Sequence, residues 1–256
     1  MTLYQKLKET LAQYKNFAVA YSGGLDSSVL LKAASEVCPS VTAVTYHSVM
    51  HPVWEKENAA QYAAALGARF IPVSTDIIAV DDISSNLPTR CYYCKRVIYR
   101  QIICAARDNG LSLVLDGSNA DDYRASTPGV RAARELGIVS PLAQCGITKQ
   151  DILRLADLLG IPMQNRATYA SLASRLPAGE RLTADKLRLI ERAELLLHSY
   201  GYDTVRVRMH SYMARIELPK ELMQRFMQDG HFDSIYSALT DMGFEYVCID
   251  MGGYTP

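Results

Sequence analysis

The sequence FAVAYSGGLDSSVLL at residues 17–31 has the order of a buried strand, a tight loop and a helix. Its first half is an apolar run of the length typical of a parallel strand, and helical periodicity resumes at Val29. The two glycines let the backbone turn sharply and come close to a ligand. The amides that open the following helix point outward at the positive end of the helix dipole. This stretch therefore predicts an anion-binding loop at the end of a strand.

No lysine follows the two glycines, so this is not a Walker A loop and does not indicate transfer of a γ-phosphate. The order SGGLDSS instead resembles the PP-loop of ATP pyrophosphatases. In those proteins the loop binds the pyrophosphate that leaves when a substrate oxygen attacks the α-phosphorus. Asp26 is the nearest acidic residue that could hold Mg²⁺. The alternative is an ordinary strand-helix turn with incidental glycines.

Strand and helix patterns alternate along the first part of the chain. Strands are expected at residues 17–21, 41–48, 70–73, 111–116 and 138–142. This repetition predicts the α/β class, with a five-stranded, parallel, doubly wound sheet that binds its ligand beyond the carboxyl ends of the strands. Residues 74–90 are expected to be irregular, with a helix at 97–107, and Pro128-Gly129 is expected to break the chain. A helix that opens with a capping box of Thr148 and Asp151 is expected to end at Gly160. The polar loop at residues 117–122 follows the fourth strand and should lie at the same edge as the SGGLDSS loop.

The nucleotide site is therefore expected to draw on both loops and on the second strand. The predicted residues are Ala20, Ser22, Gly23, Gly24, Asp26, Ser27, Ser28, Thr45, Gly117, Asn119 and Asp121.

A second domain is predicted after residue 180, giving domains at 1–180 and 181–256. Residues 163–181 are polar, contain Pro177 and Gly179, and are expected to form a linker. A helical stripe covers residues 183–200, and two alternating segments at 205–210 and 213–218 are spaced for a hairpin. Helices at 219–242 and a last strand at 246–251 complete a small α+β domain.

Composition excludes several classes of protein. The 256 residues are 49% apolar, with 27 basic and 27 acidic residues, so there is no overall charge to attract nucleic acid. No apolar run approaches the roughly 20 residues that cross a bilayer, and the N-terminus lacks a signal-peptide core, so we expect a cytoplasmic protein. In that reducing compartment the six cysteines are core residues, ligands or reactive thiols.

The motifs SGGLDSS, RCYYCK, DGSNADDYRASTPG, SPLAQCGITKQDILRLADLLGIP and SLASR occur in this order. With them the chain resembles the LarE family of ATP-dependent sulfur transferases over nearly its whole length. The resemblance implies that ATP and Mg²⁺ adenylate a carboxylate of a pyridinium mononucleotide, and that sulfur then replaces AMP. The product of such enzymes is used to make a nickel-pincer cofactor. A sulfur donor and a homo-oligomer are expected, without a nucleic-acid or membrane partner.

The resemblance also implies catalytic roles for Ser171, Arg175 and Glu194. Family members that sacrifice their own sulfur have cysteine in a CLASR stretch, whereas this chain has Ser171 there, and a hydroxyl cannot supply sulfur. Arg206 and Arg208 alternate along a strand, so both side chains point to one face and could bind the substrate phosphate together with Arg215. The alternative is a solvated strand face.

Cys91 and Cys94 form a CxxC pair that could bind a soft metal or cycle as a dithiol. The neighbouring Arg90, Lys95 and Arg96 are expected to favour the thiolates. One hypothesis is an iron-sulfur cluster whose third ligand is a weaker oxygen ligand or another cysteine, with Cys145 as the candidate. The other is a persulfide on the pair. Inert thiols are the alternative to both, and a structural zinc is disfavoured because a closed site needs four ligands and no second CxxC or His pair has the required spacing.

Two other functions stay open at this point. The chain could be a different PP-loop ligase or a tRNA-thiolating enzyme, although it has no basic patch of nucleic-acid size. It could also be a nucleotide-binding relative that transfers no sulfur.

Overall fold

The computed structural model describes residues 2–162 and 171–254, and the described chain divides into two compact units. The first comprises residues up to Ile77 together with the segment that starts at Thr89, and the second comprises Ile78–Pro88 and the chain after residue 170. The sequence pattern instead places a single boundary near residue 180. Residues 163–170 of the predicted linker lie outside the described residues.

The first unit contains a four-stranded parallel sheet in the order β3-β2-β1-β4. Its strands are β1 (Phe17–Ala20), β2 (Thr42–His47), β3 (Arg69–Ser74) and β4 (Leu113–Asp116). Every residue of β1 is buried, as the continuous apolar run predicts for a central parallel strand. The carboxyl ends of β1 and β4 therefore lie side by side at one edge of the sheet.

The fifth strand predicted at residues 138–142 is wrong. Val139 makes one isolated parallel bridge to Leu115, and the helix α8 (Pro141–Gln144) begins two residues later. Pro141 has no N–H for a strand ladder, while its restricted φ suits the first residue of a helix. The proline therefore ends the pairing after a single residue.

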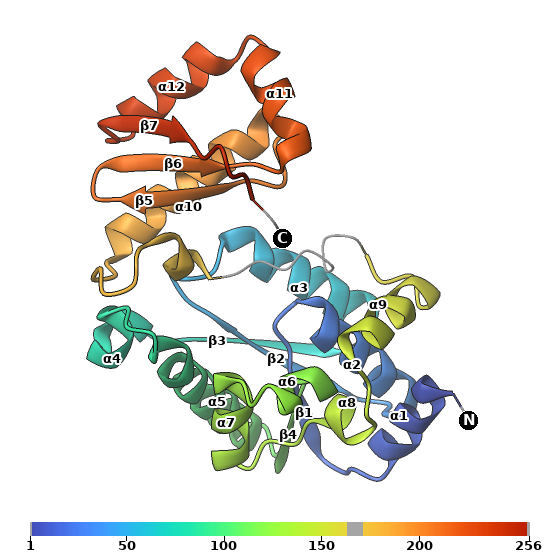
Figure 1. Ribbon diagram of the computed structural model, residues 1–256. Coiled ribbons are helices and arrows are strands. Elements are labelled where there is room, and N and C mark those ends of the chain that lie inside the picture. The colour runs from blue at the N-terminus through green and yellow to red at the C-terminus, as the bar shows by residue number, and fades with distance from the viewer. Residues whose placement is uncertain (1, 163–170, 255–256) are drawn as a thin grey trace. The chain divides into compact units, whose positions relative to one another are not determined.

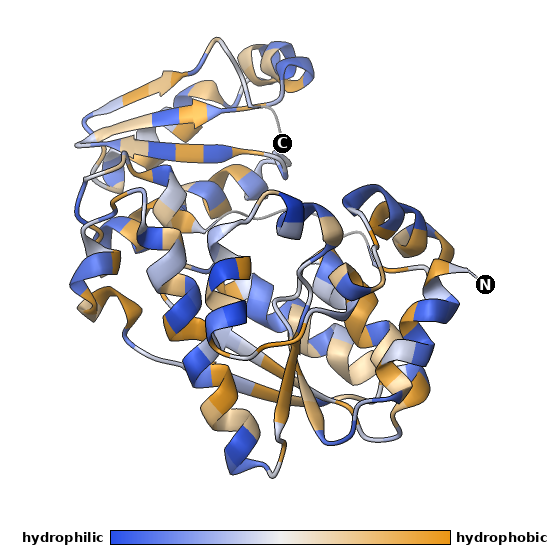
Figure 2. Cartoon of the chain, turned by 60° about the horizontal axis from the view of Figure 1, so that its bottom comes forward, coloured by the Kyte–Doolittle hydropathy of each residue, from blue (hydrophilic) through white to orange (hydrophobic). Residues whose placement is uncertain are grey.

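Helices cover both faces of this sheet (Figure 1). Side chains of α1 (Leu3–Ala12), α2 (Leu25–Val37), α3 (Val53–Ala65) and α9 (Lys149–Leu158) share one core cluster with alternate residues of β1 and β2. The long helix α5 (Arg90–Asp108) packs on the opposite face with α7 (Pro128–Glu135) beside it. Hydrophobic residues accordingly gather along the strands and inward helix faces in Figure 2.

Two helix boundaries differ from the prediction. The helix expected at residues 97–107 begins at Arg90, so the CxxC pair lies in the first two turns of α5 rather than in a loop before it. Residues 128–129, expected to break the chain, open α7, with Pro128 in its first turn and Thr127 as cap. Short helices also interrupt the segments expected to be irregular: η1 (Ile77–Ala79), α4 (Asp81–Ser84), α6 (Ala120–Arg124) and η3 (Leu172–Arg175).

The second unit is a small α+β structure. The strands β5 (Arg206–His210) and β6 (Met213–Glu217) form the predicted antiparallel hairpin, which is confirmed, and β7 (Tyr246–Ile249) adds to β6 in parallel. The helices α10 (Ala184–Ser199), α11 (Lys220–Gln228) and α12 (Phe232–Asp241) complete it.

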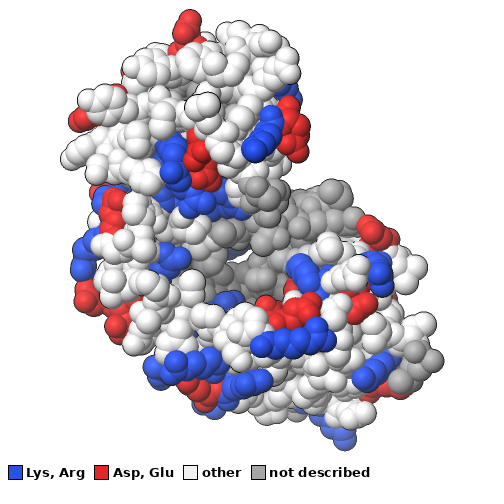
Figure 3. Space-filling view, in the orientation of Figure 1, with Lys and Arg blue, Asp and Glu red and all other residues white. Residues whose placement is uncertain are grey.

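The surface carries both signs of charge. Lys and Arg atoms are interspersed with Asp and Glu atoms on the face shown in Figure 3, as expected from equal numbers of each. Among the described helices none is both long and apolar enough to span a membrane.

Candidate functional site

The loop between β1 and α2 is held in a tight turn by its own side chains. Ser22 Oγ lies 3.0 Å from Ser27 Oγ and accepts a hydrogen bond from the Gly24 amide at 3.3 Å. Gly23 has φ of +81°, and a Cβ added there would lie 3.2 Å from Ala59 Cβ. Gly24 caps α2 without a side-chain hydrogen bond, so the first amides of this helix keep their capacity to bind an anion.

The loop after β4 lies directly against the start of α2. A Cβ added to Gly117 would lie only 2.9 Å from the Ser27 nitrogen and 3.0 Å from its Cα. Only glycine fits such a close approach of two backbones. The two loops expected at the same sheet edge are therefore in contact.

Asp26 connects these two loops to a third segment. Its Oδ2 accepts a hydrogen bond from Asn119 Nδ2 at 2.8 Å, and its Oδ1 pairs with the Lys149 ammonium. Asn119 Oδ1 in turn caps α6 by accepting from the Asp121 and Asp122 amides. Hydrogen bonds therefore hold both the nitrogen and the oxygen of the Asn119 side-chain amide.

Lys149 is a residue that the sequence analysis missed. Its backbone amide donates to Asp121 Oδ2 at 2.8 Å, which fixes the start of α9 beside the loop after β4. The sequence signal for this position, a Thr148–Asp151 capping box, identifies the helix start correctly. The capping box does not indicate which loop the Lys149 side chain faces.

The remaining predicted nucleotide residues lie at or just inside this edge. Ala20 ends β1 and pairs with Val44, so Thr45 extends one residue past the paired part of β1. Thr45 is 4% exposed, and its Oγ1 has no hydrogen-bond partner among the described residues. Ser28 is fully buried, with its Oγ 3.4 Å from the Tyr21 hydroxyl. The structure therefore places Ser28 behind the loop.

A buried carboxylate organises the loop after β4. Asp116 is 3% exposed and accepts hydrogen bonds from the Tyr99 hydroxyl at 2.6 Å, Ser118 Oγ at 2.7 Å and Ser140 Oγ at 2.6 Å. Burial, together with the charge of Asp116, raises the pKa of Tyr99 well above its usual value, so its hydroxyl stays a donor. Asp116 is a second residue that the sequence analysis missed.

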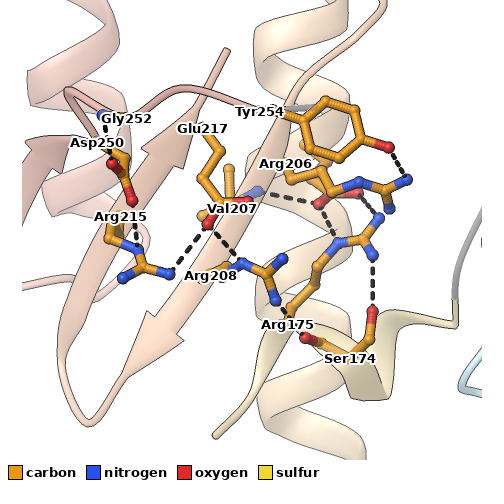
Figure 4. Close-up of polar contacts among 11 residues, drawn as sticks. Ser174, Arg175, Arg206, Val207, Arg208, Arg215, Glu217, Asp250, Gly252 and Tyr254 are labelled. Carbon is orange, nitrogen blue, oxygen red and sulfur yellow. Dashed lines mark hydrogen bonds and ion pairs between the residues drawn. The ribbon is translucent and has the colours of Figure 1, made fainter. Parts of the chain in front are cut away.

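The arginines predicted to bind phosphate lie together in the second unit (Figure 4). Arg175 and Glu194 form a buried ion pair with 2.7 Å between Nε and Oε1, and the same carboxylate oxygen accepts the Val207 amide at 3.0 Å. Both side chains are almost completely buried, at 2% and 8% exposed. This pair ties η3 and α10 to β5.

Arg208 and Arg215 share one carboxylate beside that pair. Glu217, 6% exposed, accepts from Arg208 Nε at 2.5 Å and from Arg215 at 2.9 Å. Arg215 also pairs with Asp250 at 3.5 Å, and Arg208 donates to the Ser174 carbonyl at 2.7 Å. Glu217 was not predicted, although it lies two residues after Arg215 on β6 and opposite Arg206 in the hairpin, so the alternation of side chains along the strand could have identified it.

Arg206 has an aromatic partner. Its guanidinium donates to the Tyr254 hydroxyl at 2.6 Å and lies 4.5 Å from the centre of that ring (Figure 4). The cluster of Arg175, Arg206, Arg208 and Arg215 contains three carboxylates, from Glu194, Glu217 and Asp250. Four positive and three negative charges leave one positive charge in excess, which suits a single bound anion.

Ser171 occupies a capping position rather than an open one. It precedes η3, and its Oγ accepts a hydrogen bond from the Ala173 amide at 3.3 Å. The hydroxyl thus has a structural use in this chain. Ser171, Arg175 and Glu194 all belong to the second unit, as do the other arginines of the cluster.

The two cysteines of the CxxC pair differ in environment. Cys91 is exposed, with Arg90 4.0 Å from its sulfur, whereas Cys94 is buried. Burial raises the pKa of Cys94 to about 11, and this effect exceeds the opposing effects of Arg90 and Lys95. The expectation that basic neighbours favour a thiolate is therefore wrong for Cys94.

Cys145 does not join that pair. It is 3% exposed in the core cluster of α1 and α2, with Thr10 Oγ1 3.4 Å from its sulfur. Among the described residues no three Cys, His, Asp or Glu side chains are grouped to hold a metal ion. The residues outside the described ranges include none of these four types. Within the described part of the chain, the side chains therefore do not fit a cluster held by Cys91, Cys94 and Cys145.

The same finding bears on Mg²⁺. Mg²⁺ is commonly bound through one or two carboxylates together with substrate phosphates and water, so Asp26 alone fits an ion carried by a nucleotide. It does not fit a metal cage built from protein groups. Such an ion would supply neutralisation of phosphate charge at this edge.

Comparisons with known proteins identify relatives along the whole chain. The chain is 36% identical over 250 residues to the pyridinium-3,5-bisthiocarboxylic acid mononucleotide synthase of Lactiplantibacillus plantarum, covering 97% of this chain and 90% of that protein. It is 36% identical over 251 residues to an uncharacterized protein of Synechocystis sp., covering 98% and 94%. It is 31% identical over 252 residues to an uncharacterized protein of Methanocaldococcus jannaschii, covering 97% and 96%. No protein-family model matches the chain.

Proposed function

Since this chain belongs to the LarE family, we propose that it activates a carboxylate of a pyridinium mononucleotide with ATP and then exchanges an oxygen of that carboxylate for sulfur. The relative from Lactiplantibacillus plantarum is named as a synthase of a bisthiocarboxylic acid mononucleotide. The product named there requires sulfur to replace carboxylate oxygen. A carboxylate is a poor acceptor for a sulfur nucleophile, so an activation step has to come first.

The single observation that carries the activation step is the convergence of two loops on Asp26 at the carboxyl edge of the sheet. The free amides at the start of α2 would bind the pyrophosphate portion of ATP. The substrate carboxylate would attack the α-phosphorus and release pyrophosphate. The resulting acyl-adenylate has AMP as a good leaving group.

The arginine cluster of the second unit would bind the phosphate of the mononucleotide. Its excess of positive charge and its fork-shaped donors would attract a phosphate monoester. Glu217 and Glu194 would keep these side chains in place in the absence of substrate. A phosphate oxygen would replace the Tyr254 hydroxyl as the acceptor of the hydrogen bond from Arg206.

The sulfur would come from outside the chain and pass through Cys91. Ser171 has no sulfur, and Cys91 is the exposed member of the CxxC pair. The outer sulfur of a Cys91 persulfide would attack the acyl carbon and displace AMP. A second thiol would then cleave the acyl disulfide and release the thiocarboxylate, leaving a disulfide that a reductant must reset. Cys94, the second cysteine of the CxxC pair, would supply this thiol.

The test separates the two steps. We expect the protein to convert ATP to AMP and pyrophosphate when the pyridinium carboxylate mononucleotide is present. Asp26→Asn should slow pyrophosphate release by roughly 10²-fold or more, the effect typical of losing an electrostatic catalytic group. Cys91→Ala should leave pyrophosphate release intact and abolish formation of the thiocarboxylate, measured by mass spectrometry with a persulfide donor.

The matched control is Cys104→Ala, which removes another exposed thiol of α5 and should change neither step. ADP as the product would contradict the adenylation step. Full sulfur transfer by a Cys91→Ala, Cys94→Ala double variant would instead show that an external donor attacks the adenylate directly.

A further inference from the structure

The loop between β1 and α2 has no cationic side chain to bind a phosphate. It offers backbone amides and hydroxyls to a polyphosphate, but no lysine follows its glycines, and Asp26 adds a negative charge beside the phosphates. The cation that a Walker lysine supplies in other loops must therefore come from elsewhere. Lys149 is 123 residues away in the sequence, and its ammonium pairs with Asp26.

The backbone of Lys149 is anchored, while its side chain is partly exposed and pairs with Asp26. Its amide donates to Asp121 Oδ2, and the capping box of α9 closes on the next turn with Thr148 Oγ1 2.6 Å from Asp151 Oδ2. The Ala120 amide donates to the Ile147 carbonyl at 2.8 Å just before it. The Lys149 side chain itself is 45% exposed. The flexible side chain can therefore move its ammonium group while the backbone of Lys149 stays fixed.

We propose that Lys149 is the phosphate-binding lysine of this site, held by Asp26 in the nucleotide-free protein. This inference rests on the proposed function. With ATP and its divalent ion bound, Asp26 would hold the ion, and Lys149 would leave Asp26 and bind the phosphate chain. There it stabilises the negative charge that develops on the leaving pyrophosphate. Asp26 keeps a cationic partner in both states.

This exchange predicts opposite effects for one substitution. Lys149→Met removes the competitor for Asp26, so a divalent ion alone should bind the nucleotide-free protein more tightly. The same substitution removes a phosphate ligand, so the nucleotide should bind more weakly. A lysine that only holds the two segments together would not change the two affinities in opposite directions.

The experiment measures both affinities and the reaction. We expect Lys149→Met to tighten Mn²⁺ binding to the nucleotide-free protein by several-fold, measured by electron paramagnetic resonance. It should weaken calorimetric binding of α,β-methylene-ATP with Mg²⁺ by roughly 10-fold or more, and slow pyrophosphate release by roughly 10²-fold. Lys149→Arg keeps the charge and should bind Mn²⁺ as the unchanged protein does, with partly restored turnover.

Lys8→Met is the control, because Lys8 makes a comparable ion pair with Glu36 on the surface of the same unit, 3.3 Å apart. It should change none of the three quantities. Unchanged or weaker Mn²⁺ binding in Lys149→Met, or full turnover in that variant, would overturn the inference. If Lys149→Met fails to fold, Lys149→Gln replaces it. An Mn²⁺ affinity of Lys149→Gln equal to that of the unsubstituted protein would then overturn the inference. Failure of the unsubstituted protein to bind the nucleotide analogue would instead reject the proposed function.

Discussion

Arg208 illustrates how single residues of the arginine cluster are prepared before a substrate arrives. Glu217 orients its Nε and the Ser174 carbonyl accepts from another nitrogen of the same guanidinium. A lysine at this position carries the charge but cannot keep both contacts and still present a planar fork. We expect Arg208→Lys to weaken binding of the mononucleotide by about 1–3 kcal/mol, measured by calorimetry.

Arg188→Lys is the matched control, since Arg188 lies on α10 of the same unit and is 66% exposed. The Arg188→Lys variant should bind the mononucleotide with the same affinity as the unsubstituted protein. Equal affinity in Arg208→Lys as well would assign Arg208 to the stability of the second unit rather than to substrate binding.

At the scale of elements, the loop after β4 is held by the buried Asp116 carboxylate. Asparagine has one acceptor oxygen and presents an NH₂ group to hydroxyls that now donate to a carboxylate. We expect Asp116→Asn to lower the free energy of unfolding by about 2–4 kcal/mol in urea denaturation. It should also slow pyrophosphate release, because Asn119 reaches Asp26 from this loop.

Asp81→Asn provides the comparison, because Asp81 pairs with Arg181 at the surface and is 83% exposed. Asp81→Asn should lower the free energy of unfolding by less than about 1 kcal/mol. An Asp116→Asn protein as stable as Asp81→Asn would show that the buried network does not depend on the charge of Asp116.

At the scale of the whole molecule, most of the large apolar side chains exposed among the described residues belong to the second unit. Met251 is 91% exposed and Tyr246 on the edge strand β7 is 66% exposed. Such surfaces favour association. We expect a homo-oligomer by light scattering after gel filtration, and a lower mass for a Tyr246→Glu, Met251→Glu variant. Leu158→Glu, at an exposed position of the first unit, should leave the mass unchanged.

A monomeric unsubstituted protein, or an oligomer that survives both charged substitutions, would contradict this prediction. The cytoplasmic location and the lack of a nucleic-acid partner stay predictions.

Local sequence signals predicted those parts of the fold that depend on neighbours along the chain. The apolar run of β1, the glycine loop, the capping box of α9 and the β5–β6 hairpin each follow from a few consecutive residues. The predicted fifth strand failed because strand pairing depends on a partner as well as on local pattern, and Pro141 ends it after one bridge. The start of α5 was missed because residues 90–96 have no clear apolar periodicity to mark a helix.

The sequence by itself determined the parallel α/β unit, the loop at its edge and the absence of a sulfur atom at Ser171, because these are properties of residue identity and short-range order. Only the tertiary structure decided which groups share that edge. Lys149 meets Asp26 across 123 positions, and Glu194 of α10 meets Arg175 of η3 and the Val207 amide of β5. It also decided that Cys91 is exposed while Cys94 is buried. Charge partners and burial arise from packing of distant segments, and no local pattern encodes them.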